Sequence, residues 1–139
     1  MKRTIRNCAI AAALASLIGA GVARAEPVQV SLADYAFNFP AHGYEIIVVG
    51  KTGDFREKAT NDYIYITDGG YTIWARTDRL GRSDRQKFLA FYNAECKRSA
   101  KCAIRATGEV ELDDDLQMIF RIHAAKLAGG GSHLTVGTQ

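Results

Sequence analysis

The sequence predicts a mainly β fold, a five-stranded barrel with one helix between the third and fourth strands. Five segments between residues 45 and 127 have the β-branched or alternating apolar pattern typical of strands. One stretch with helical spacing separates the third of these segments from the fourth. An immunoglobulin-like sandwich would need about seven strands, so a small barrel fits the pattern better.

The first three strands are expected before residue 77. Residues 45–55 form a β-branched run that contains Gly50, where the strand is expected to bend. Residues 62–67 and 71–76 alternate with period two, and the Asp-Gly-Gly sequence at 68–70 is a strong signal for a hairpin turn. The second and third strands should therefore pair antiparallel.

The helix is expected to begin near Ser83, because Ser83 and Gln86 have the spacing of a capping box. Its apolar residues fall on one face at helical spacing. They are Phe88, Leu89, Tyr92 and Cys96. Residues 103–110 and 116–123 then predict the last two strands, and the acidic loop 113–115 separates them.

The two ends of this region are harder to interpret. Residues 26–44 are expected to form an N-terminal extension, of which Val28 to Leu32 have the pattern of an added edge strand. Residues 128–139 contain a Gly-Gly-Gly-Ser stretch with neither apolar period nor bulk, so they predict a flexible tail.

The order strand, strand, strand, helix, strand, strand resembles that of an OB-fold over about residues 45–127. The resemblance rests on Gly50 late in the first strand, on residues 63–68 before the turn and on residues 106–110 in the fourth strand. It is a loose pattern of strands and glycines. Among OB-fold proteins, the chain looks most like those of the bacterial periplasm, because its N-terminal residues have the pattern of an export signal.

Residues 1–25 have the three features of a secretory signal peptide in their usual order. Lys2, Arg3 and Arg6 give a positive start, an apolar run follows from residue 8 to residue 22, and residues 23–25 form a small-x-small cleavage site. A membrane anchor is the weaker interpretation, because a spanning helix needs about 20 predominantly apolar residues. We expect cleavage after Ala25, a mature chain without a membrane span, and a periplasmic or secreted location.

Removal of the signal peptide changes both the charge and the cysteine count. Without Lys2, Arg3, Arg6 and Arg24, the 18 basic residues become 14 against 15 acidic ones, a net charge of −1. This balance disfavours nucleic-acid binding, for which a basic domain or face is typical.

Cys8 is lost with the signal, which leaves Cys96 and Cys102 in a compartment where disulfides persist. A redox pair usually has two residues between its cysteines, and a zinc site needs four ligands. A structural disulfide between Cys96 and Cys102 is therefore expected.

Strand alternation assigns the candidate ligand-binding face. If Ile64, Ile66, Ile73 and Ala75 point into the barrel, the residues between them point outward, and the last strand has Leu116, Met118, Phe120 and Ile122 inward. Aromatic and guanidinium groups on one face suit stacking on bases or sugars, and these strands usually carry the ligand in OB-folds. The candidate residues are Tyr63, Tyr65, Trp74, Arg76, Arg121 and His123. The alternative is that the tyrosines point inward or that the N-terminal segment covers them.

No motif identifies a reaction. The three histidines lie apart without ligand spacing, so neither a metal nor a cofactor is expected. There is no nucleophile-elbow, zincin or phosphate-loop motif. The sequence therefore favours an exported, non-enzymatic binding module for a small molecule, glycan or protein. An exported nucleic-acid-binding OB-fold protein and an accessory subunit of an envelope or secreted complex stay open as alternatives.

Overall fold

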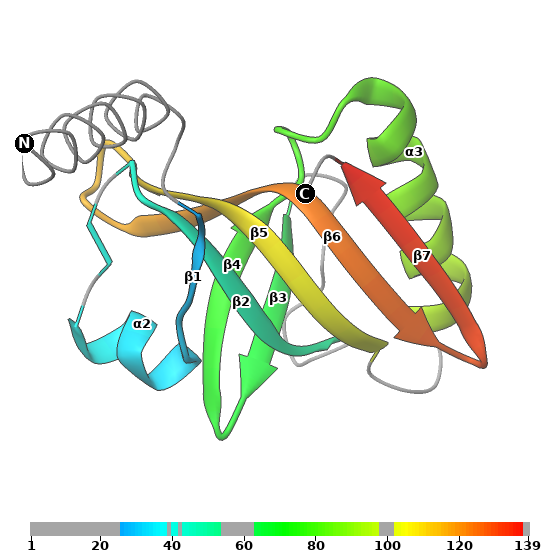
Figure 1. The fold of residues 1–139 in the computed structure, drawn as a ribbon, viewed down its shortest axis with the longest axis horizontal. Helices are drawn as coiled ribbons and strands as arrows, with labels where there is room; N and C mark the ends of the chain where they lie inside the picture. Colours follow the sequence, from blue (N-terminus) through cyan, green and yellow to red (C-terminus); the bar gives the residue numbers. More distant parts are fainter. Residues whose placement is uncertain (1–25, 39, 42, 54–62, 98–101, 138–139) are drawn as a thin grey trace, which may run out of the picture.

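The computed structural model describes residues 26–38, 40–41, 43–53, 63–97 and 102–137, and its centre is a β-sheet that closes into a barrel (Figure 1). Neighbouring strands pair in the order β2, β3, β4, β6, β5, and β5 pairs back onto β2. The five strands are β2 (Glu45–Thr52), β3 (Tyr63–Asp68), β4 (Tyr71–Arg76), β5 (Cys102–Leu112) and β6 (Met118–Gly129). The predicted signal peptide lies outside the described residues.

The pairing that closes the barrel is the antiparallel ladder between β2 and β5, which runs from Glu45↔Glu109 to Thr52↔Cys102. β4 and β6 pair in parallel at Ala75↔Phe120 and Arg76↔Arg121. Closure of five strands leaves no free edge within the barrel. The prediction of a mainly β, OB-like barrel is confirmed, and its last strand, β6, lies beside its third, β4.

The hairpin of β3 and β4 forms as expected. Asp68 and Tyr71 are paired, and Gly69 and Gly70 between them have φ angles of 56° and 86°. Positive φ at both central positions is what a tight two-residue hairpin requires, and glycine adopts it without steric cost.

The N-terminal extension contains the predicted edge strand in shortened form and also a helix that we did not predict. β1 (Val28–Gln29) pairs parallel with Ile46 and Ile47 of β2. α2 (Leu32–Asn38) follows and buries Leu32 and Tyr35 in the core. It lies at the opposite end of the barrel from α3 (Figure 1). In addition to the helix expected between the third and fourth barrel strands, the structure thus has a helix in the N-terminal extension.

The prediction of a flexible tail is wrong for most of its length. β6 continues to Gly129, and β7 (Ser132–Gly137) pairs with it antiparallel from Gly129↔Ser132 to Ala124↔Gly137. Gly130 and Gly131, with φ angles of 59° and 78°, form the turn. The glycines that suggested a linker are therefore a hairpin turn of the same kind as the one at 69–70.

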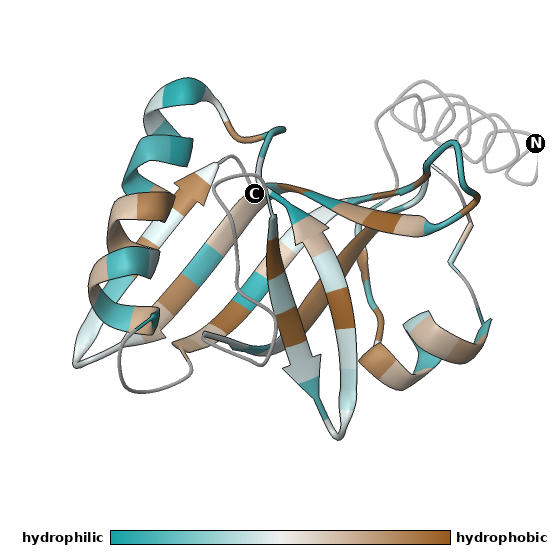
Figure 2. Cartoon of the chain, turned by 180° about the vertical axis from the view of Figure 1, so that it is seen from behind, coloured by the Kyte–Doolittle hydropathy of each residue, from teal (hydrophilic) through white to brown (hydrophobic). Residues whose placement is uncertain are grey.

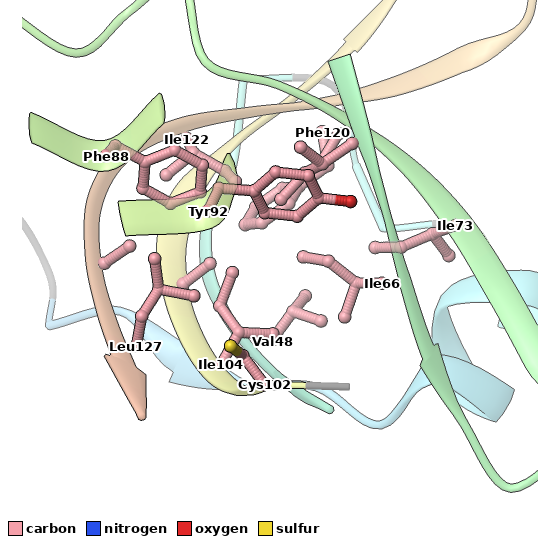
Figure 3. Packing of buried hydrophobic residues seen from close by; sticks show 14 of the residues in the cluster. Val48, Ile66, Ile73, Phe88, Tyr92, Cys102, Ile104, Phe120, Ile122 and Leu127 are labelled. Atoms are coloured by element: carbon pink, nitrogen blue, oxygen red, sulfur yellow. The ribbon is translucent and has the colours of Figure 1, made fainter. Parts of the chain in front are cut away.

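α3 (Arg82–Phe91) continues into a π-helical turn (Tyr92–Cys96), so together they cover the predicted segment. The expected capping box is wrong, because the N-cap is Gly81 and no side chain caps the helix. The predicted apolar face is confirmed. Phe88 and Tyr92 stack with ring centroids 6.4 Å apart and lie over Phe120 and Ile122 (Figure 3).

The barrel interior is filled by alternate residues of the strands, visible as colour bands along them in Figure 2. Ile64, Ile66 and Ala75 are fully buried, and Ile73 is nearly so. Phe120 and Ile122 point inward as predicted. Leu116 does not, because it precedes β6 in the turn after Asp113, with a φ of 61° and 78% of its surface exposed.

The disulfide between Cys96 and Cys102 forms as predicted. It joins the π-helical turn to the first residue of β5, and both cysteines are buried. The bond therefore fixes the end of the helical segment against the barrel.

Candidate functional site

The predicted aromatic residues of β3 and β4 gather on the outer face of the hairpin. Tyr63 makes edge-to-face contacts with Tyr65 and Trp74, with ring centroids 5.6 Å and 5.0 Å apart. All three are half-buried, as is Arg76, the partner of Tyr63 in the ladder. Edge-to-face pairs of this kind are stabilising, so the three rings form one packed cluster.

Arg121 lies on the last barrel strand, as predicted, but acidic side chains bind its guanidinium group. It donates to Asp78 at 2.5 Å and also to Glu111, which accepts from Arg79 at 2.5 Å as well. Burial acts to lower the pKa of Arg121, but the hydrogen bonds and charges of Asp78 and Glu111 outweigh burial and raise it. These contacts connect β6 to β5 and to the segment after β4.

His123 is half-buried, and its Nε2 lies against a carboxylate oxygen of Glu45. The side chain of His123 therefore connects β6 to β2 and does not reach the aromatic cluster. The structure thus brings Tyr63, Tyr65, Trp74 and Arg76 together, whereas Arg121 and His123 each have acidic partners.

A groove opens where β4 meets α2 and the turn between β5 and β6; we call it the α2 groove. Its volume is about 520 Å³, within the range typical of small-molecule pockets. Trp74 lines it and also contacts Tyr63, so the groove is continuous with the aromatic cluster. The other described lining residues come from α2 and the following segment (Tyr35, Ala36, Pro40), from β4 (Thr72, Ile73) and from the β5–β6 region (Val110, Leu112, Leu116, Gln117, Met118).

Two of the residues that line the α2 groove each have a buried hydrogen-bond donor without a partner among the described residues. These donors are the hydroxyl of Tyr35 and the indole Nε1 of Trp74. Burial also raises the pKa of Tyr35 above its ordinary value, so the phenol keeps its proton. A buried donor left unpaired costs about 1–3 kcal/mol, which makes an acceptor at this place favourable.

The sequence interpretation found Trp74 but missed Tyr35 and the rest of the groove. A signal for α2 was present, because Ser31 and Asp34 have the spacing of a helix N-cap. In the structure, Ser31 Oγ accepts from the backbone N–H of Asp34 at 3.0 Å. Leu32 and Tyr35, three residues apart, then fall on one buried face.

The described residues hold no group of three or more His, Cys, Asp or Glu side chains placed to bind a metal ion. Within the same residues, no helix is both long and apolar enough to cross a bilayer.

Comparisons with known proteins support the fold. No protein family and no curated protein matches the sequence. Among solved structures, the chain is similar to the hypothetical protein ygiW from E. coli, with a TM-score of 0.50 and 9% identity over 76% of this chain and 99% of that one. It is also similar to part of the Entamoeba histolytica asparaginyl-tRNA synthetase in complex with asparaginyl-adenylate, with a TM-score of 0.51 and 13% identity over 76% of this chain and 24% of the synthetase. At these identities, the likeness concerns the fold alone.

Proposed function

We propose that the chain is an exported, non-enzymatic binding module whose ligand occupies the α2 groove. The observation that carries this proposal is the pair of unpartnered donors on Tyr35 and Trp74, two residues that line a pocket of about 520 Å³. Specific small-molecule sites combine an apolar surface with a few polar groups that fix orientation. The α2 groove has this composition.

The ligand is uncharged and largely apolar, and it has at least one hydrogen-bond acceptor. None of the described lining residues is charged, so an ionic group would be desolvated there without a counter-charge. The two unpartnered groups are both donors in their ordinary protonation states. A neutral molecule with a carbonyl or ether oxygen satisfies both conditions.

Export is part of the proposal and is supported by the signal-like pattern of residues 1–25 and by the disulfide. Disulfides persist in oxidising compartments such as the periplasm and the extracellular space. A small-molecule ligand of the envelope or the surroundings would meet the module in either place.

The proposal can be tested with prodan, an uncharged naphthyl ketone, because Trp74 is the only tryptophan in the sequence and reports on the groove. We expect prodan to bind the exported protein and to change the fluorescence of Trp74. Leu116→Asp places a charge at an exposed position of the groove and should weaken binding at least tenfold. Fluorescence titration measures the dissociation constant of prodan for the unmodified protein and for the Leu116→Asp variant.

Val28→Asp is the matched control, since Val28 is 64% exposed and lies outside the groove. It should leave prodan binding unchanged. The anionic dye 1-anilinonaphthalene-8-sulfonate should bind at least tenfold more weakly than prodan. Equal effects of the two Asp variants, or preference for the anionic dye, would contradict the proposal.

A second prediction concerns the hydroxyl of Tyr35. Tyr35→Phe removes a buried donor that has no partner among the described residues, so the free energy of unfolding should stay equal or rise by about 1 kcal/mol. The same change should weaken prodan binding several-fold, because one donor to its carbonyl is lost. Urea unfolding and fluorescence titration of the same variant give the two quantities. A loss of stability with unchanged binding would show that the hydroxyl is structural.

A further inference from the structure

A hollow of about 280 Å³ lies on the outer face of β2, β5, β6 and β7, and it shares no lining residue with the α2 groove. Its floor contains Ala103 and Ala128, which are cross-strand partners. In the same row, Lys51 of β2 lies beside Ala103, and His133 of β7 lies beside Ala128. The two small side chains thus form a depression between two basic residues.

The adjacent row on the same face places two cations beside this floor. Arg105 and Lys126 are direct cross-strand partners, and both are exposed. Like charges directly opposite each other destabilise a sheet pair. Arg105 donates to Gln29 Oε1 at 3.2 Å, and the residues that line the hollow include no carboxylate.

The described residues offer these cations no ion pair. Acidic side chains elsewhere in the described residues pair instead with Arg79 and Arg121, and Glu45 contacts His123. Lys51, Arg105 and Lys126 are therefore three neighbouring positive charges on one sheet face of a chain whose net charge without residues 1–25 is −1. An anion seated above the alanines would offset their mutual repulsion.

We propose that this hollow, which we call the cationic hollow, binds phosphate groups carried by a small molecule. The planar fork of Arg105 matches phosphate oxygens, and the ammonium group of Lys126 supplies a point charge beside it. Lys51 does not line the hollow, but it is the ladder partner of Ala103 and adds a third positive charge nearby. The alanine floor lets the phosphate approach the strands closely. This inference goes beyond the proposed function, because the α2 groove takes an uncharged ligand and neither site depends on the other.

The test uses pyrophosphate as the probe and isothermal titration calorimetry of the exported protein at low salt. Lys126→Glu should weaken pyrophosphate binding at least tenfold. The new carboxylate lies opposite Arg105, where an opposite-charge pair stabilises the sheet, so the thermal midpoint should stay equal or rise. This second readout shows that the variant is folded.

Lys87→Glu is the control, because Lys87 is exposed on α3 and the substitution changes the net charge by the same amount. It should alter pyrophosphate binding less than twofold. The proposal is overturned if the unmodified protein does not bind pyrophosphate, if the two Glu variants weaken binding equally, or if single-stranded DNA binds through Lys126 while pyrophosphate does not. Prodan binding should be unaffected by Lys126→Glu, which separates this site from the α2 groove.

Discussion

Replacing Gly108 with alanine is expected to lower the free energy of unfolding by about 3 kcal/mol, at the upper end of the cost of overpacking. A Cβ atom at this position would lie 2.1 Å from the carbonyl oxygen of Arg121 and 2.7 Å from its carbonyl carbon. Both are backbone atoms of the paired strand, so they cannot move without disturbing the β5–β6 ladder. The pairing register also shifts between Thr107 and Gly108, which places the glycine at an irregularity of the barrel.

The expected loss of stability is informative, because alanine ordinarily stabilises a strand relative to glycine by roughly 0.5–1 kcal/mol. Gly81→Ala is a suitable control, since a Cβ there meets nothing within 4 Å and the backbone has a negative φ of −56°. As an N-cap position it should lose at most about 1 kcal/mol. Urea unfolding of both variants measures the difference, and a Gly108→Ala variant as stable as Gly81→Ala would show that the ladder relaxes around the added atom.

Much of the fold could be predicted from the sequence because the strands follow strong local patterns. The alternation of residues 63–76 and its Gly-Gly turn predicted the β3–β4 hairpin and its inward residues correctly. The Gly-Gly turn at 130–131 was missed because serine and histidine follow it, and the apolar residues of β7 are only Leu134 and Val136. Pairing with β6, rather than local propensity, makes this segment a strand.

The candidate site was less predictable because it is made of segments that meet only in three dimensions. Trp74 could be placed on the outer face by alternation, whereas its neighbour Tyr35 belongs to a short helix some 40 positions earlier in the chain. Arg121 and His123 were also placed on the correct strand, but Asp78, Glu111 and Glu45, which pair with them, come from three other segments. Local patterns give the direction of a side chain and not its partners.

The structure also changes the meaning of the charge balance. A net charge of −1 without residues 1–25 disfavours a protein that is basic overall, yet three cations lie together on one sheet face. Meanwhile Arg121, the half-buried ladder partner of Arg76, is neutralised by Asp78 and Glu111. The local distribution of charged side chains therefore distinguishes an uncharged groove from a cationic surface. The net charge alone does not show this difference.

Replacing both Cys96 and Cys102 with alanine is expected to cost about 2–4 kcal/mol of unfolding free energy. Closing the short loop between them contributes about 2 kcal/mol in the chain-entropy model, and removal of a disulfide from a small secreted domain typically costs 2–5 kcal/mol. Both sulfurs are also buried, and Cys102 packs so closely against Gly129 that a Cβ there would lie 2.3 Å from Sγ. The double variant therefore loses packing as well as the cross-link.

Urea unfolding with and without a thiol reductant separates these contributions. The reductant should lower the transition midpoint of the unmodified protein, because its unfolded chain is then no longer cross-linked, and should leave the double variant unchanged. A double variant as stable as the unmodified protein would contradict a structural role for the bond. If the prediction holds, chain produced in a reducing compartment will lack this stabilisation and be more easily unfolded.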